Sequence, residues 1–175
     1  KKRMAIVGAV CLLALGFCAW RSVQQCRTWK NNATLWSHTL SVAPDCALAN
    51  GNLGNSYYRH GMFAQALERY EHWITIEPNF ARARRAAARA AKELGLVDRA
   101  IAHYQSAVAI ANAKEPRSWS IRAEYASYLV RQKRYREALA EYEEVLRRAP
   151  PDPEPVRKRV EQLRRVLGLS GTPSP

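Results

Sequence analysis

Four basic residues follow one another at helical spacing in the middle of the chain. They are Arg82, Arg85, Arg89 and Lys92, separated by 3, 4 and 3 residues, so on a helix they form one cationic stripe. Like charges at this spacing repel one another. An anion would relieve that repulsion, and arginine grips a carboxylate through two parallel hydrogen bonds. The stripe therefore indicates contact with a carboxylate-bearing peptide; the alternative is that the cations only solvate an alanine-rich helix.

Residues suited to catalysis or metal binding are sparse and dispersed. Four histidines are scattered among different predicted helices: His38, His60, His72 and His103. The four cysteines form no Cys-x-x-Cys or Cys/His cluster: Cys11, Cys18, Cys26 and Cys46. The chain also has no nucleophile motif and no glycine-rich phosphate loop. We therefore expect no catalytic residue, no cofactor and no bound metal in this chain.

The charge of the chain is high but evenly spread. There are 28 Lys and Arg against 15 Asp and Glu, which gives a net charge of +13. No segment is a dense basic tail, so a dedicated nucleic-acid-binding arm is not expected. The apolar fraction of 47% is enough for a packed core.

Aromatic residues recur at a nearly fixed interval. Trp36, Tyr70, Tyr104 and Tyr142 are separated by 34, 34 and 38 residues. Small residues and turn residues keep the same register: Pro44 and Pro78, Gly61 and Gly95, and Ala66, Ala100 and Ala138. A period of about 34 residues is typical of a helix-turn-helix solenoid, in which each unit buries its apolar face only against its neighbours. The sequence therefore predicts an all-α solenoid.

The unit resembles the tetratricopeptide repeat. Residues 47–80 carry Leu53-Gly54, Tyr57, Ala66, Tyr70 and Pro78 at that family's positions, with Asn50 and Trp73 as departures. A second unit spans 81–114, and a third spans 119–152 after a four-residue insertion, with Lys133 in place of the turn glycine. The resemblance implies that the small and aromatic residues are scaffold, and that the repeats bind a protein or peptide.

Further elements flank the three repeats over 47–152. Residues 22–46 are expected to connect to them as a half repeat, with a helix from Thr28 to Val42 that ends at Pro44. Residues 153–168 are expected to form a capping helix with Val160 and Leu163 on its apolar face and Arg164 facing outward. Residues 169–175 are expected to be a disordered tail.

In the resembling family, the first helix of each unit lines a concave groove. Carried onto this sequence, the groove contains Asn52, Asn55, Tyr58 and Arg59 from the first unit, the cationic stripe from the second, and Arg131 from the third. Glu124 is expected opposite the stripe as an ion-pair partner rather than as an acid-base catalyst. These residues predict a groove for a protein or peptide, with acidic character on the ligand.

The amino-terminal segment is apolar. Residues 4–20 contain no charge and follow three cations at 1–3. Their 17 residues meet the lower limit of about 17–25 for a spanning helix, and Trp20 and Arg21 suit an interface. We predict a transmembrane helix over 1–21, in contact with lipid through 4–20. The alternative is a secretory signal peptide, although Phe17 is large for a cleavage site.

The leading cations favour a cytoplasmic amino end, which would place the repeats on the exoplasmic side, in the periplasm or in the lumen of a secretory organelle.

The stretch from Gln25 to Gly54 narrows the resemblance. It contains Trp29, Leu35-Trp36, Leu40 and Pro44, between the apolar segment and the repeats. This arrangement is similar to the last membrane helix and tetratricopeptide tail of membrane protein O-mannosyltransferases and their bacterial relatives. The resemblance implies a non-catalytic carboxyl-terminal part of a multi-pass glycosyltransferase. The alternative is a single-span scaffold protein of an envelope assembly or secretion complex.

Overall fold

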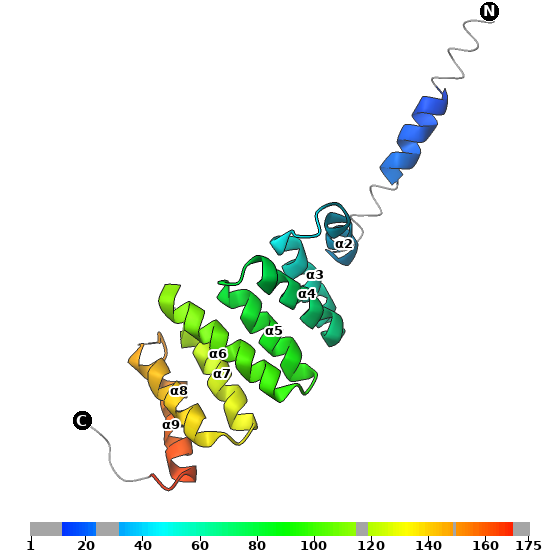
Figure 1. Cartoon of the computed structure of the whole chain (residues 1–175). Helices are drawn as coiled ribbons and strands as arrows, with labels where there is room; N and C mark the ends of the chain where they lie inside the picture. Colours follow the sequence, from blue (N-terminus) through cyan, green and yellow to red (C-terminus); the bar gives the residue numbers. More distant parts are fainter. Residues whose placement is uncertain (1–11, 24–31, 115–118, 149, 170–175) are drawn as a thin grey trace, which may run out of the picture.

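The computed structural model describes residues 12–23, 32–114, 119–148 and 150–169. Within these ranges every regular element is a helix. Residues 12–23 are helical. The remaining helices are α2 (Asn32–Val42), α3 (Ala47–Arg59), α4 (Phe63–Ile76), α5 (Ala81–Glu93), α6 (Val97–Lys114), α7 (Trp119–Arg131), α8 (Tyr135–Arg147) and α9 (Glu154–Val166) (Figure 1).

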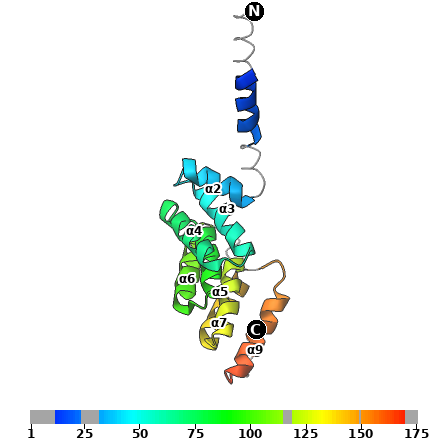
Figure 2. The ribbon, with the colours of Figure 1, turned by 90° about the vertical axis from the view of Figure 1, so that its right-hand side faces the viewer.

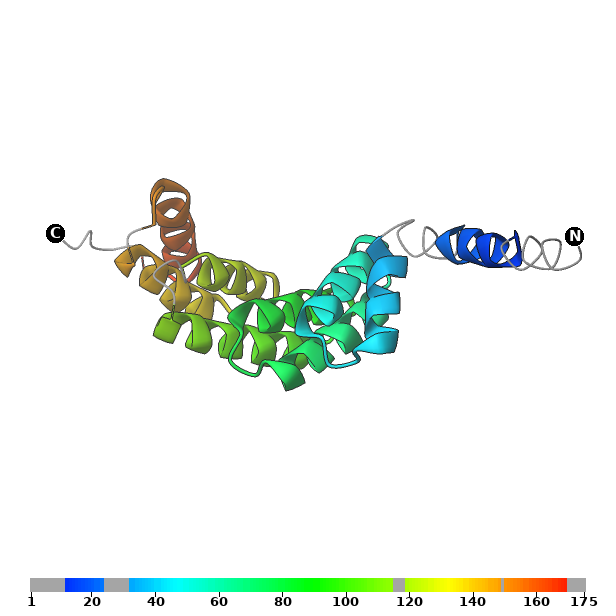
Figure 3. The same ribbon diagram turned by 90° about the horizontal axis from the view of Figure 1, so that it is seen from above.

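The helices stack in chain order as antiparallel pairs. The pairs are α3 with α4, α5 with α6, and α7 with α8, and α4 contacts α5 while α6 contacts α7. The second helices α4 and α6 lie together on one side of the stack, and the first helices α3, α5 and α7 lie on the other (Figure 2). Viewed from above, the stack bends into an arc with the first helices along its inner side (Figure 3). The chain is therefore an all-α solenoid.

Small residues on the first helix of a pair let the second helix come close. A Cβ atom added to Gly54 would lie 2.7 Å from Cε1 of Tyr70, and one added to Gly51 would lie 2.8 Å from Cζ3 of Trp73. The repeating tyrosines are buried, with 2% of Tyr70 and 1% of Tyr104 exposed. Trp73, a departure from the family pattern, therefore fits because the facing residue is glycine.

The alanine-rich helix α5 lies between α4 and α6 and packs against both. Six of its alanines are buried, at 0–4% exposure: Ala81, Ala83, Ala87, Ala88, Ala90 and Ala91. Alanine offers little side-chain bulk for packing, but its short side chain lets α4 and α6 pack directly against α5.

Asn50, the other departure from the family pattern, is fully buried and ties the start of α3 to the preceding turn. Its Nδ2 donates to the carbonyl oxygens of Pro44 at 3.0 Å and Cys46 at 3.1 Å. The amide therefore fixes the corner between α2 and α3, which a larger apolar side chain would not do.

The helix pairs turn through a residue with positive φ. Gly61 and Gly95 have φ of 75° and 72°, and Lys133 occupies the equivalent place with φ of 60°. In each case the next backbone N–H reaches back to a carbonyl five residues earlier, as Arg134 does to Leu129 at 3.0 Å. Lys133 therefore adopts the left-handed conformation that glycine adopts at little cost.

The last helix, α9, covers the end of the stack. Val160 and Leu163 are buried against the repeats. Arg164, expected to face outward, keeps 41% of its side chain exposed, and its Nη2 lies 2.8 Å from Oε1 of Glu143 on α8. The sequence did not predict this ion pair. Residues 170–175 of the predicted tail lie outside the described residues.

The amino-terminal segment is only partly described. In residues 12–23 the large apolar side chains are all exposed, from 54% for Val23 to 75% for Leu13. Among the described residues, no helix combines the length and the hydropathy needed to cross a bilayer. Residues 4–11 of the predicted span and 28–31 of the predicted connecting helix lie outside the described ranges.

Replacing Lys133 with Gly should raise the free energy of unfolding by about 1 kcal/mol. The left-handed conformation costs a residue with a Cβ about 1–2 kcal/mol, which glycine avoids. Glycine also has a larger conformational entropy in the unfolded state, which cancels part of this gain. Urea unfolding followed by circular dichroism measures the change. Lys133→Ala is the control, since it removes the charge and keeps the Cβ. Equal stability of the two variants would contradict a strained turn.

Candidate functional site

Arg89 lies at the centre of the inner face and links three helices. Its guanidinium carbon is 5.1 Å from the centroid of the Tyr58 ring on α3. Its Nε is 3.6 Å from Oε1 of Glu124 on α7, the partner that the sequence predicted. The same carboxylate oxygen accepts a hydrogen bond from the hydroxyl of Tyr104 at 3.0 Å. Arg89 therefore braces the first helices of all three repeats.

Burial and the nearby charge of Glu124 keep Tyr104 a hydrogen-bond donor. Burial is the larger effect, and both it and the Glu124 charge raise the pKa of the Tyr104 phenol. The phenol therefore stays protonated across the physiological range and holds Glu124 in place for Arg89.

Lys92 also has an internal partner. Its Nζ is 2.9 Å from Oε1 of Glu93, and the Tyr58 hydroxyl donates to the same oxygen at 3.3 Å. The hydrogen bond from Lys92 lowers the pKa of the Glu93 carboxyl, and the charge of Arg131 on α7 acts in the same direction. The structure thus brings Arg131 into the electrostatic range of this cluster.

Two of the four cations of the stripe therefore have carboxylate partners. Arg89 pairs with Glu124, as the sequence predicted, and Lys92 pairs with Glu93, which the sequence analysis did not single out. Arg82 lies over the Phe80 ring, with 5.9 Å from guanidinium carbon to centroid. Within the described residues, Arg85 forms no hydrogen bond, ion pair or ring contact.

Arg59 is a further cation of this face without a carboxylate partner. It ends α3 and is exposed, and no ion pair to it occurs within the part of the chain that the structure describes. Arg59 also lines a cavity of about 340 Å³ together with Asn55, Tyr58, Tyr70, Ala86 and Arg89. Positive charge on this cavity therefore exceeds what the chain itself neutralises.

A second cavity adjoins the first along α3. It measures about 310 Å³ and is lined by Ala47, Leu48, Gly51, Asn52, Asn55, Trp73, Glu77, Phe80 and Arg82. Asn55 lines both cavities. Sequence reasoning missed the contribution of Trp73 and Phe80, whose rings lie 5.1 Å apart. The sequence did contain a signal for this contribution: Trp73 stands where the family has alanine, and Gly51 on the facing helix leaves room for its ring.

Asn52 and Asn55 are held in defined orientations. The Nδ2 of Asn52 donates to the carbonyl oxygen of Leu48 at 3.0 Å. The Oδ1 of Asn55 accepts from the hydroxyl of Tyr70 at 2.8 Å, which leaves the Nδ2 of Asn55 as the available donor. Burial, the largest effect, raises the pKa of Tyr70 to about 12, so the phenol remains protonated.

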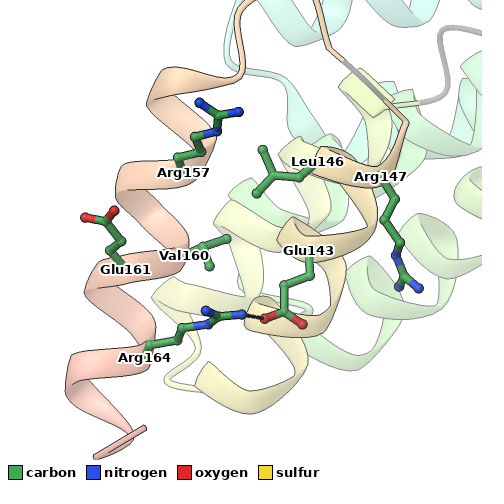
Figure 4. A pocket seen from close by; sticks show the side chains of 7 residues that line it. All are labelled: Glu143, Leu146, Arg147, Arg157, Val160, Glu161 and Arg164. Atoms are coloured by element: carbon green, nitrogen blue, oxygen red, sulfur yellow. Dashed lines mark hydrogen bonds and ion pairs between the residues drawn. The ribbon is translucent and has the colours of Figure 1, made fainter. Parts of the chain in front are cut away.

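A further cavity of about 620 Å³ lies between α8 and α9 (Figure 4). Leu146 and Val160 face it from opposite helices. Its arginines are already paired, since Arg164 contacts Glu143 at 2.8 Å and Arg147 contacts Glu144 at 2.8 Å. This cleft therefore has less unbalanced charge than the inner face, and its apolar floor belongs to the packing of the cap.

Titratable groups do not gather into a metal or catalytic centre among the described residues. No group of three or more His, Cys, Asp or Glu side chains there has a geometry that could hold a metal ion. The arrangement of the inner face is suited to binding an anionic or mixed apolar-anionic ligand.

Replacing Arg89 with Glu should lower the free energy of unfolding by about 1–2 kcal/mol. The change removes the cation from the Tyr58 ring and places a second carboxylate beside Glu124. The loss stays small because Arg89 is partly exposed to solvent. Arg85→Glu should change the free energy of unfolding by less than about 0.5 kcal/mol, because Arg85 has no partner to lose. Urea titration of the two variants measures the difference, and equal losses would show that Arg89 is not a brace.

Comparisons with known proteins agree with this architecture. A family model described as tetratricopeptide repeat matches residues 52–114 and 86–153. A crystal structure of MamA superposes with a TM-score of 0.70 at 16% identity, and covers 83% of this chain and 84% of that one. No curated protein sequence matches this chain.

Two smaller solved domains are also similar. The first TPR of Spaghetti (RPAP3), bound to the HSP90 peptide SRMEEVD, has a TM-score of 0.58 at 22% identity and covers 70% of this chain and 93% of that one. The OM64 TPR domain from Arabidopsis has a TM-score of 0.57 at 19% identity and covers 68% of this chain and 94% of that one. At these identities the likeness concerns the fold.

The two matched ranges overlap and run through the helix pairs from α3 to α8, over more than half of the chain. The chain therefore belongs to the tetratricopeptide repeat family.

Proposed function

We propose that this chain is a non-enzymatic interaction module that binds an acidic segment of a protein or peptide along α3, α5 and α7. The observation that carries the proposal is the charge balance of the inner face. Arg89 and Lys92 are neutralised by carboxylates of the chain, whereas Arg59, Arg82, Arg85 and Arg131 form no ion pair within the described residues. Arg59 and Arg85 also have no ring contact there. A guanidinium without a partner is a ready donor for a carboxylate from outside.

The cavities beside these arginines favour a polypeptide over nucleic acid. Trp73 and Phe80 give one cavity an apolar wall, and Glu77, Glu93 and Glu124 put negative charges among the cations. Those carboxylates would repel a phosphate backbone. A segment of alternating acidic and apolar side chains suits the surface better. The RPAP3 structure, a related fold, holds a short peptide with three acidic residues, SRMEEVD.

Selection from a displayed library of random linear peptides tests the proposal. The full chain in detergent micelles should enrich peptides that carry Asp or Glu. The double variant Arg59→Glu/Arg85→Glu should bind the enriched peptides at least about tenfold more weakly, because each lost charge-assisted hydrogen bond is worth about 1.5–3 kcal/mol.

The matched control is Arg136→Glu/Lys158→Glu, which makes the same change in net charge on exposed positions of α8 and α9. This control should keep its affinity for the peptides. Equal weakening by both double variants would show that only the net charge of the chain matters, not the position of Arg59 and Arg85. If no peptides were enriched, the proposal of peptide binding would be wrong.

We also propose that residues 4–20 anchor the module in a bilayer, with the repeats on the exoplasmic side. The support is the run of uncharged residues and the exposure of its large apolar side chains from Leu12 to Trp20, at 55–75%. The full chain should float with phosphatidylcholine vesicles, and Leu13→Asp/Leu15→Asp should release it, because a charged residue within a span costs about 3 kcal/mol. Flotation that the double variant retains would refute the anchor, and a reporter after Pro175 active only in the cytoplasm would refute the orientation.

The wider context that we propose is the carboxyl-terminal, non-catalytic part of a multi-pass glycosyltransferase of the protein O-mannosyltransferase kind. Its support is the order of elements in the sequence: an apolar segment, a helix bearing Trp36 that ends before Pro44, and then the repeats. Several spanning segments encoded upstream of Lys1 are expected. A start codon directly upstream would favour the alternative, a single-span scaffold of an envelope or secretion complex.

A further inference from the structure

We propose that the bound segment carries an apolar side chain and a carboxylate about three residues apart, with the apolar side chain in the cavity beside Trp73 and the carboxylate beside Arg59 and Arg85. This inference rests on the proposed function and specifies the ligand that the groove selects.

The cavity beside Trp73 offers mainly apolar surface. The indole Nε1 of Trp73 already donates to Oε2 of Glu77 at 2.9 Å, and the amide nitrogen of Asn52 is engaged by Leu48. Its apolar part is the Trp73 and Phe80 rings, tilted by 47° to one another, and the Leu48 side chain, which is 65% exposed. Arg82 also lines this cavity, with its guanidinium carbon 5.9 Å from the Phe80 centroid. With about 310 Å³ it has room for one aromatic or branched aliphatic side chain.

The adjoining cavity beside Tyr58 attracts a carboxylate. Arg59 lines it and lies near enough to Tyr70 for its charge to act on that phenol. Arg85 lies one helical turn before Arg89 on the same face of α5, between Arg82, which lines the cavity beside Trp73, and Arg89, which lines the adjoining one. Arg89 remains engaged with Glu124, which leaves Arg59 and Arg85 for the ligand.

The distance between the cavities sets the spacing on the ligand. Along α3, one cavity is lined by positions 47–55 and the other by positions 55–59, so their centres are about six residues apart. At about 1.5 Å per helical residue this is roughly 9 Å. An extended peptide advances about 3.3 Å per residue, so the two side chains lie about three residues apart.

Asn55 lies where the peptide backbone would cross from one cavity to the other. Its Oδ1 is fixed by the Tyr70 hydroxyl at 2.8 Å, and within the described residues its Nδ2 has no acceptor. A backbone carbonyl between the apolar residue and the acidic residue would accept that hydrogen bond. The amide therefore favours an extended segment over a helical one, whose carbonyls are used internally.

Two fluorescein-labelled decapeptides with a Gly-Ser background test the inference. One carries Trp and, three residues later, Glu; the other carries them in the reverse order. Fluorescence anisotropy with the full chain in detergent micelles measures the affinities. One of the two peptides should bind, and replacing its Trp with Ala or its Glu with Gln should each weaken binding at least about tenfold.

Matched protein variants locate each side chain. Leu48→Ser should weaken binding of the Trp peptide several-fold but not of its Ala counterpart. Val166→Ser, at a similarly exposed aliphatic residue on α9 (63% against 65%), should change neither. Arg59→Gln/Arg85→Gln should weaken the Glu peptide but not its Gln counterpart. Arg136→Gln/Lys158→Gln is the control for charge.

The outcomes separate this inference from the proposed function. Effects of Leu48→Ser that are the same for Trp and Ala peptides would overturn the placement of the apolar side chain. Failure of both decapeptides, while library-selected acidic peptides still bind in a manner that depends on Arg59 and Arg85, would overturn the paired recognition alone. If the library also yields no binder, the proposed function fails with it.

Discussion

The close approach of two helices at a glycine is the constraint on which the rest of the structure depends. A Cβ on Gly54 would lie 2.7 Å from the Tyr70 ring, and one on Gly51 would lie 2.8 Å from the Trp73 ring. Aromatic rings can occupy these places only while the facing residue has no side chain. The contact fixes the register of α3 against α4, and the same rings form walls of the two inner cavities. Scaffold and site thus share residues, and neither can be altered without the other.

The inner face combines two kinds of arginine. Arg89 makes ring and carboxylate contacts to the first helices on either side and so supports the curvature of the arc. Arg59 and Arg85 make no such contacts within the described residues. The difference comes from where the chain places its carboxylates, since Glu124 reaches Arg89 and Glu93 reaches Lys92. On this positively charged surface, an anion from outside is therefore bound most strongly at the few arginines that have no carboxylate partner.

Much of the fold follows from the sequence because its cause is local and repeated. The interval between Trp36, Tyr70 and Tyr104, together with the matching glycines and alanines, predicts helix pairs that begin near 47, 81 and 119, where α3, α5 and α7 start. The positive φ of Lys133 could not be predicted, because lysine has no intrinsic preference for the left-handed conformation and adopts it here only in the turn between α7 and α8. Of the ion pairs of Arg89 and Arg164, only the first could be predicted from the sequence: Glu124 lies on the first helix of the next repeat and faces the same groove, whereas the pair with Glu143 depends on how α9 docks. The apolar cavity escaped prediction, since it requires Trp73, Gly51 and Phe80 from three separate segments.

The alanines of α5 have a consequence for the thermodynamics of association. Six buried alanines form the body of the central helix, and alanine has no rotamers to lose. These alanines therefore contribute no loss of side-chain conformational entropy when a ligand binds. The entropy lost on association comes instead from the ligand and from the long side chains of Arg59 and Arg85, each of which holds about 2 kcal/mol of rotamer freedom. The entropic cost of binding at this surface therefore depends mainly on how many of those long side chains a partner immobilises. Rearrangement of the helices contributes less.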